Sequence, residues 1–184
     1  MTVKTYGRFL VVFFLAAFTI ACNRYPLTVK LFKDHLGKKV DLSGYDFVYN
    51  SKQVYSYAEF RAKYPFVTVN YIDEDCAICK IKVREWCDNA EKIPLHENLA
   101  HLFVFRGKNF ETFLRYSQGK TEFPFFVMSS EEFTYANNNG SIDRQIIDAG
   151  FLIDRDNRIK IIGDPFVSEK MKDLYNRVVR GQIK

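Results

Sequence analysis

Two cysteines, Cys76 and Cys79, stand at the boundary between a predicted strand and a predicted helix. The strand is Phe66–Ile72, whose β-branched and aromatic residues are typical of a buried strand. The helix begins at Ala77, and residues three apart in a first turn share one face, so the two sulfur atoms can form a disulfide. Free backbone N–H groups at a helix start also favour a thiolate, the nucleophile of thiol–disulfide exchange. The pattern therefore favours redox chemistry.

Two other interpretations of the cysteine pair stay open. The pair could be a static disulfide that stabilises the fold and does not turn over. It could also be half of a zinc site, although such a site would need a second pair and only Cys87 remains downstream. The alternative function is therefore a non-catalytic binding module, which could bind metal. We expect no metal, and no cofactor besides a redox-active Cys76–Cys79 disulfide.

The N-terminal segment has the charge pattern of a signal peptide. Lys4 and Arg8 precede the uncharged run Phe9–Ile20, and no acidic residue accompanies them. The run is shorter than the about 20 apolar residues of a membrane-spanning helix, and it is typical of a signal-peptide core.

This segment ends at Ala21-Cys22, which resembles the lipobox of bacterial lipoproteins, although Thr19 stands where that motif usually has leucine. The resemblance implies that residues 1–21 are a lipoprotein signal peptide and that Cys22 is lipidated; a plain signal peptide is the alternative. Either interpretation places the mature protein outside the cytoplasm, where cysteine pairs can be oxidised. We expect it in the bacterial cell envelope, facing the periplasm or another extracytoplasmic space. The lipidated form would be tethered to the membrane.

The composition is that of a folded domain. The 18 Phe and 11 Tyr among 184 residues supply apolar surface that offsets the entropy cost of ordering the chain. Only 9 Gly and 5 Pro are present, which excludes a collagen-like or low-complexity chain. The net charge of +5 is mild and its basic residues are dispersed, so we expect no nucleic-acid partner.

Strands and helices alternate along the rest of the chain, which predicts an α/β domain with a mixed central sheet flanked by helices. Residues 129–148 carry no clear pattern. The other predicted elements are helices 56–64, 77–90, 110–117 and 169–179 and strands 101–106, 123–128, 150–154 and 158–162.

Two segments resemble thioredoxin-like envelope reductases of the TlpA and ResA kind. Val67–Tyr71 followed by the cysteine pair is similar to their strand and active-site entry. Gly150–Asp156 followed by Ile161–Pro165 is similar to their later hairpin, with its Phe-Leu-Ile-Asp run and Gly-Asn/Asp-Pro exit. The resemblance covers about residues 56–180.

The resemblance implies a thioredoxin-like domain at 56–184, preceded by an N-terminal extension at 22–55. It implies thiol–disulfide exchange in which Cys76 attacks and Cys79 resolves. The implied partners are proteins with thiols or disulfides, and an upstream thiol reductant.

Two positions bear on this chemistry, one at which envelope members often have the same residue and one that departs from the family. Asn70 stands where cytoplasmic thioredoxins have a buried aspartate that accepts a proton. An amide cannot accept that proton, so Glu74 or water must do so. The loop Asp148-Ala149-Gly150 stands where the family has a cis-proline that docks the substrate backbone. The loss of this proline implies altered thiol–disulfide exchange, or a cysteine pair that metal ions can reach.

Three acidic residues, Asp73, Glu74 and Asp75, immediately precede Cys76. Negative charge near a forming thiolate disfavours its ionisation and opposes the effect of the helix N-terminus. We therefore expect a reductant-like or isomerase-like redox poise.

The remaining candidate groups are expected to be structural. Cys87 and Trp86 are predicted to lie in the core, and His35, His96 and His101 show no metal-ligand spacing.

Overall fold

The computed structural model describes residues 29–42, 47–51, 53–88, 97–117, 124–129 and 142–183. The chain divides into two compact units, Met1–His35 and Leu36–Lys184, and the described residues 29–35 of the first are helical. The expected signal peptide and the expected lipidation site Cys22 lie outside the described residues. Within the described ranges, no helix combines the length and apolar character needed to cross a bilayer.

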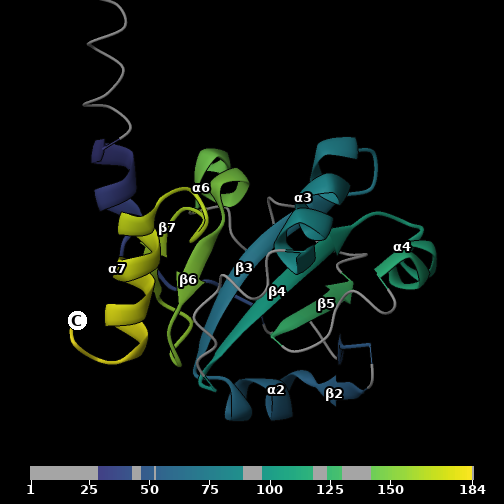
Figure 1. Cartoon of the computed structure of the whole chain (residues 1–184), viewed down its shortest axis with the longest axis horizontal. Coiled ribbons are helices and arrows are strands. Elements are labelled where there is room, and N and C mark those ends of the chain that lie inside the picture. The colour runs from purple at the N-terminus through teal and green to yellow at the C-terminus, as the bar shows by residue number, and fades with distance from the viewer. Residues whose placement is uncertain are drawn as a thin grey trace, which may run out of the picture. The chain divides into compact units, whose positions relative to one another are not determined.

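The second unit alternates strands and helices (Figure 1). Its strands are β1 Phe47–Tyr49, β2 Val54–Ser56, β3 Phe66–Asp73, β4 Leu99–Arg106, β5 Phe125–Ser129, β6 Phe151–Ile153 and β7 Ile159–Ile162. Its helices are α2 Tyr57–Lys63, α3 Ala77–Asp88, α4 Phe110–Ser117, α6 Arg144–Ala149 and α7 Glu169–Val179. The bounds predicted for α4 and α7 agree with the structure at both ends.

The strands form one mixed sheet in the order β2-β1-β5-β4-β3-β6-β7. The central strands β5, β4 and β3 are parallel, and the outer strands join antiparallel. Strands β3 and β4 pair from Phe66 opposite Leu99 to Asp73 opposite Arg106. The predicted α/β class with a mixed central sheet is therefore confirmed, and the register places Asp73 beside Arg106 where β3 leads to α3.

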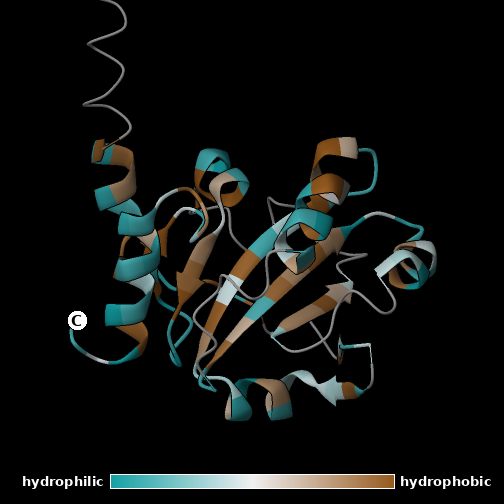
Figure 2. Ribbon diagram, in the orientation of Figure 1, coloured by the Kyte–Doolittle hydropathy of each residue, from teal (hydrophilic) through white to brown (hydrophobic). Residues whose placement is uncertain are grey.

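One face of the central strands is covered by α3 and α4. Val83 and Trp86 of α3 and Phe113 of α4 lie in one buried cluster with Phe103 and Phe105 of β4. A second cluster joins α7 to β6 and β7. Figure 2 shows the apolar residues concentrated in the strands and the hydrophilic ones on outer helix surfaces. The predicted core position of Trp86 is confirmed.

The sheet begins upstream of residue 56, where the thioredoxin-like domain was expected to start. Strand β1 pairs with both β2 and β5, and Val48 is fully buried. Further upstream, Lys39 forms an isolated bridge with Arg158, and Val40 is fully buried. The described part of residues 36–55 therefore belongs to the same unit as the sheet.

Helix α6 occupies a segment that the sequence left unassigned. The Asp143 side chain accepts a hydrogen bond from the backbone N–H of Gln145 at 2.8 Å and caps the helix, while Ile146 and Ile147 are buried. Residues 148 and 149, predicted to form a docking loop with Gly150, are instead the end of this helix, and Gly150 is its C-cap. A helix of fewer than two turns is too short for hydrophobic periodicity to detect.

Candidate redox site

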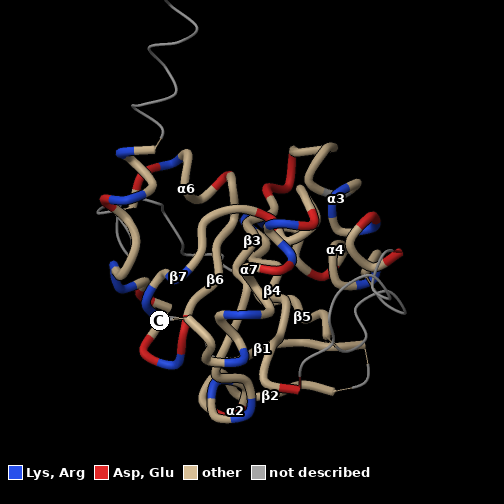
Figure 3. The backbone as a smooth tube through the Cα atoms, turned by 60° about the vertical axis from the view of Figure 1, so that its left-hand side comes forward, with Lys and Arg blue, Asp and Glu red and all other residues tan. Residues whose placement is uncertain are grey.

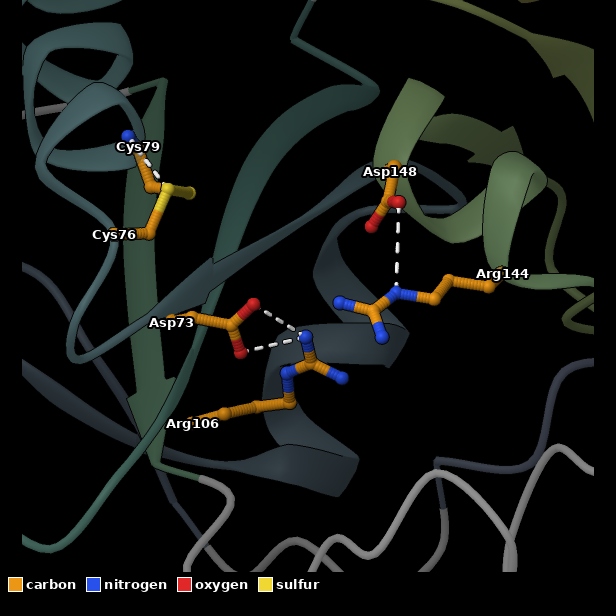
Figure 4. Close-up of a disulfide and its surroundings, with 6 residues drawn as sticks. All are labelled: Asp73, Cys76, Cys79, Arg106, Arg144 and Asp148. Atoms are coloured by element: carbon orange, nitrogen blue, oxygen red, sulfur yellow. Dashed lines mark hydrogen bonds and ion pairs between the residues drawn. A yellow bond between two sulfur atoms is a disulfide. The ribbon is translucent and has the colours of Figure 1, made fainter.

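Cys76 and Cys79 form a disulfide at the start of α3, with their Cα atoms 5.2 Å apart. The backbone N–H of Cys76 donates to the carbonyl of Asp73, and that of Cys79 donates to the carbonyl of Cys76, each at 3.1 Å. These two bonds turn the chain from the end of β3 directly into the helix. Both cysteines are half-buried, and Figure 4 shows their disulfide at the start of α3.

The two sulfur atoms have different surroundings. The backbone N–H of Cys79 donates to Sγ of Cys76 at 3.1 Å. In the reduced protein, the same donor would stabilise a thiolate on Cys76. The side chain of Cys79 instead packs against the apolar cluster beneath α3. This asymmetry favours Cys76 as the nucleophile and Cys79 as the resolving thiol.

Asp73 is engaged by Arg106. The Nη2 atom of Arg106 lies 2.5 Å and 2.6 Å from the two carboxylate oxygens of Asp73. The guanidinium group of Arg106 also lies 5.6 Å from the ring centroid of Tyr71. Because a cation counters its charge, Asp73 opposes a thiolate on Cys76 less than a free carboxylate would.

Both carboxylate oxygens of Glu74 are bound by the loop between β4 and α4. Oε2 accepts the backbone N–H of Lys108 at 2.8 Å, and Oε1 accepts a hydrogen bond from the side-chain amide of Asn109. A Cβ atom at Gly107 would lie 2.5 Å from Cβ of Glu74, so only glycine fits this close approach. Glu74 therefore anchors the loop, and Asp75 is the exposed member of the acidic run.

Asn70 is buried on β3 and faces the start of β6. It is 2 % exposed, and its Nδ2 atom has no hydrogen-bond partner among the described residues. A Cβ atom at Gly150 would lie 2.6 Å from Oδ1 of Asn70. The position where cytoplasmic thioredoxins have a proton acceptor thus holds an amide packed against the backbone of Gly150.

Neither the comparison with family models nor that with curated proteins gives a match. Among solved structures, the thioredoxin domain of a thiol-disulfide oxidoreductase from Bacteroides vulgatus matches with a TM-score of 0.50 at 13% identity, over 78% of this chain and 97% of that chain. A second structure from B. vulgatus, described as a thiol-disulfide oxidoreductase, matches with a TM-score of 0.53 at 18% identity, over 78% and 96% of the two chains. The chain has a thioredoxin-like fold. The fold implied by the sequence resemblance is therefore confirmed.

Beside the disulfide, the thioredoxin-like domain has a pocket of about 810 Å³ that is open to solvent. Acidic and basic residues line it together, and Figure 3 shows positions of both charges along the backbone of the domain. The sequence predicted only the acidic part. The lining residues are Asp73, Glu74, Asp75, Arg106, Gly107, Lys108 and Arg144.

A second polar contact that the sequence did not predict holds the redox helix of the thioredoxin-like domain in place. The carboxylate of Asp164 accepts a hydrogen bond from the indole N–H of Trp86 at 2.9 Å and another from the backbone N–H of Phe166 at 2.8 Å. The Trp86 bond connects α3 to the segment that follows β7, and the Phe166 bond fixes the Asp164 side chain within that segment. The Gly163-Asp164-Pro165 exit was visible in the sequence as part of the resemblance, but its role as an anchor for α3 was not.

Of the remaining candidate groups, His101 and Cys87 lie in the thioredoxin-like domain, and His35 lies in the helix of the first unit. His101 is fully buried, its Nδ1 lies 2.8 Å from the Thr68 hydroxyl, and burial lowers the pKa of His101 to about 3, so the ring is neutral. Cys87 is half-buried and packs against the cluster beneath α3. His96 lies outside the described residues. Within them, no group of three or more His, Cys, Asp or Glu side chains is arranged to hold a metal.

Proposed function

We propose that this protein is a thiol–disulfide oxidoreductase of the cell envelope, with Cys76 as the attacking thiol and Cys79 as the resolving thiol. The observation that carries the proposal is the hydrogen bond from the Cys79 N–H to Sγ of Cys76 within a half-buried disulfide at a helix start. The thioredoxin-like fold supports the proposal. The substrates are proteins with thiols or disulfides.

The proposed reaction is two successive thiol–disulfide exchanges. The Cys76 thiolate attacks one sulfur of a substrate disulfide, and the other substrate sulfur leaves as a thiolate that takes a proton from water. Cys79 then loses its proton to water and attacks Sγ of Cys76, which restores the Cys76–Cys79 disulfide and releases the first substrate sulfur. Two electrons pass to the substrate, and an upstream thiol reductant must return them. Water carries the protons because Asn70 is an amide and Glu74 is engaged by the loop.

The redox poise is expected to be that of a reductant or isomerase. One N–H donor supports the Cys76 thiolate, while the exposed Asp75 opposes it through its negative charge. We expect a potential clearly more negative than the roughly −120 mV of the strongly oxidising DsbA type. The measurement is a titration in glutathione redox buffers, with the Cys76 and Cys79 thiols quantified by alkylation and mass spectrometry.

The same titration distinguishes the alternatives. Reversible cycling supports an oxidoreductase, whereas a disulfide that resists all buffers identifies a static disulfide or a binding module whose cysteines do not turn over.

Asp75→Asn is expected to make the potential less negative, because it removes the exposed charge and leaves the Asp73–Arg106 pair in place. A potential near that of DsbA, or one that does not respond to Asp75→Asn, would contradict the electrostatic argument.

We also propose that the chain is tethered to the envelope membrane through a lipid on Cys22. The charged start, the apolar run Phe9–Ile20 and the Ala21-Cys22 junction support this proposal. Mass spectrometry of the membrane fraction is expected to show a diacylated or triacylated Cys22 as the first residue. The variant Cys22→Ser is expected to leave the membrane fraction under high-salt washing, and equal retention of this variant would count against lipidation.

A further inference from the structure

Two arginine side chains from distant parts of the chain line the same pocket beside the disulfide. Arg106 ends β4, and Arg144 begins α6. Figure 4 shows both guanidinium groups directed into the space between α6 and the end of β3, with Asp73 beside Arg106. Lys108, whose side chain is exposed, lines the pocket as well.

Both guanidinium groups retain hydrogen-bond donors. Arg106 uses Nη2 to contact Asp73, and its Nε is buried without a hydrogen-bond partner among the described residues. The Nε atom of Arg144 lies 3.7 Å from the carboxylate of Asp148, which is an ion pair longer than a hydrogen bond, and the Arg144 side chain is 74% exposed. An arginine has five N–H donors, so each can take a further acceptor.

The acidic residues of the pocket do not saturate these donors. Asp73 is already bound to Arg106, and Glu74 is bound to the backbone of Lys108 and the amide of Asn109. Asp75 is exposed and immediately precedes Cys76. Arg144, Lys108 and the donors of Arg106 that Asp73 does not use are therefore available to a ligand that enters the pocket.

We propose that this pocket binds a carboxylate of the thiol or disulfide partner, held between Arg106 and Arg144. Guanidinium groups match carboxylates in geometry and charge, and the volume of about 810 Å³ suits a side chain or a small peptide. The pocket borders the residue before Cys76, so a carboxylate a few bonds from the reacting sulfur reaches it. The inference deepens the proposed function by naming the chemistry that selects its partner.

The carboxylate has two possible sources. One is an acidic residue near the cysteine of a substrate protein, and the other is a small peptide thiol such as glutathione. Both are tested on the oxidised full chain by NMR titration, which needs no turnover. The probes are S-methylglutathione and a peptide whose Asp residues flank a serine in place of cysteine, each with an uncharged amide analogue.

We expect at least one acidic probe to shift the side-chain signals of Arg106 and Arg144, and its amide analogue to bind more weakly. Arg144→Gln is expected to weaken this binding about fivefold, the effect of losing one exposed charged contact. Arg115→Gln is the matched control, since Arg115 forms the same i,i+4 ion pair at 3.7 Å with Glu111 on α4, outside the pocket. Binding by the peptide alone identifies protein substrates, and binding by S-methylglutathione alone identifies a small thiol.

Equal binding of each acidic probe and its amide analogue, or an Arg144→Gln affinity equal to that of Arg115→Gln, would overturn the inference. Exchange kinetics with disulfide-containing versions of the same probes test the carboxylate pocket separately from the proposed oxidoreductase function. Selective binding without turnover would reject the oxidoreductase and retain the carboxylate pocket. Turnover without selectivity for acidic probes would retain the oxidoreductase and reject the carboxylate pocket.

Discussion

Cys79→Ser is expected to accumulate mixed disulfides with partner proteins, whereas Cys76→Ser is expected to trap none. Cys76 carries the sulfur that the Cys79 N–H supports, so it makes the first attack. Without the Cys79 thiol, the bond between Cys76 and the substrate has no neighbouring thiol to resolve it. Turnover of a small disulfide substrate is expected to fall to the uncatalysed rate in both variants. Non-reducing gels with mass spectrometry of the trapped species, and a disulfide-reduction assay, make the measurement.

Cys87→Ala is the control for this prediction. Cys87 lies further along α3 and is half-buried against the core. Its removal is therefore expected to leave trapping and turnover close to those of the unmodified chain. Equal trapping by Cys76→Ser and Cys79→Ser would reject the assignment of the two roles. Trapping by Cys79→Ser that disappears when Cys87 is also replaced would assign the attack to Cys87.

The cysteine pair could be predicted from the sequence because its geometry is local. The spacing of Cys76 and Cys79, the strand before them and the helix after them all lie within one short segment, and the structure forms the disulfide there. The basic half of the site could not be predicted in this way. Arg106 meets Asp73 across 33 residues of sequence, through the pairing register of β3 and β4. Charge near the cysteines was therefore predicted as purely acidic, whereas the folded site contains cations as well.

The same distinction between local and distant contacts explains where the predicted helices and strands differ from those of the structure. The predicted bounds of α4 and α7 match the structure because each helix has an apolar face of two turns or more. Strands β1 and β2 are three residues long, and α6 is shorter than two turns. Segments this short have no informative period, so their conformation depends on the sheet against which they pack. The resemblance also implied a docking loop at residues 148–150, where the structure has the end of α6.

Gly150→Ala is expected to lower the free energy of unfolding by about 2–6 kcal/mol. The backbone of Gly150 has φ 73 and ψ 162, a region that is essentially confined to glycine and costs a residue with a Cβ atom about 1–3 kcal/mol. The new Cβ would also lie 2.6 Å from Oδ1 of the buried Asn70, and overpacking of this kind adds about 1–3 kcal/mol. Urea denaturation of the full chain, monitored by circular dichroism, measures the difference.

Gly37→Ala separates the two contributions to this loss. Gly37 also has a positive φ, +79, but no atom lies within 4 Å of the position that its Cβ would take, so its replacement is expected to cost only the backbone contribution, about 1–2 kcal/mol. Combining Gly150→Ala with Asn70→Ala removes the clashing oxygen and leaves the backbone carbonyl of Val69 at 3.3 Å as the nearest neighbour. In the Asn70→Ala background, the cost of Gly150→Ala is therefore expected to approach that of Gly37→Ala. Equal costs for Gly150→Ala and Gly37→Ala in the unmodified chain would instead show that the Asn70 side chain moves to accommodate the new Cβ atom. The start of β6 would then not be fixed by this contact.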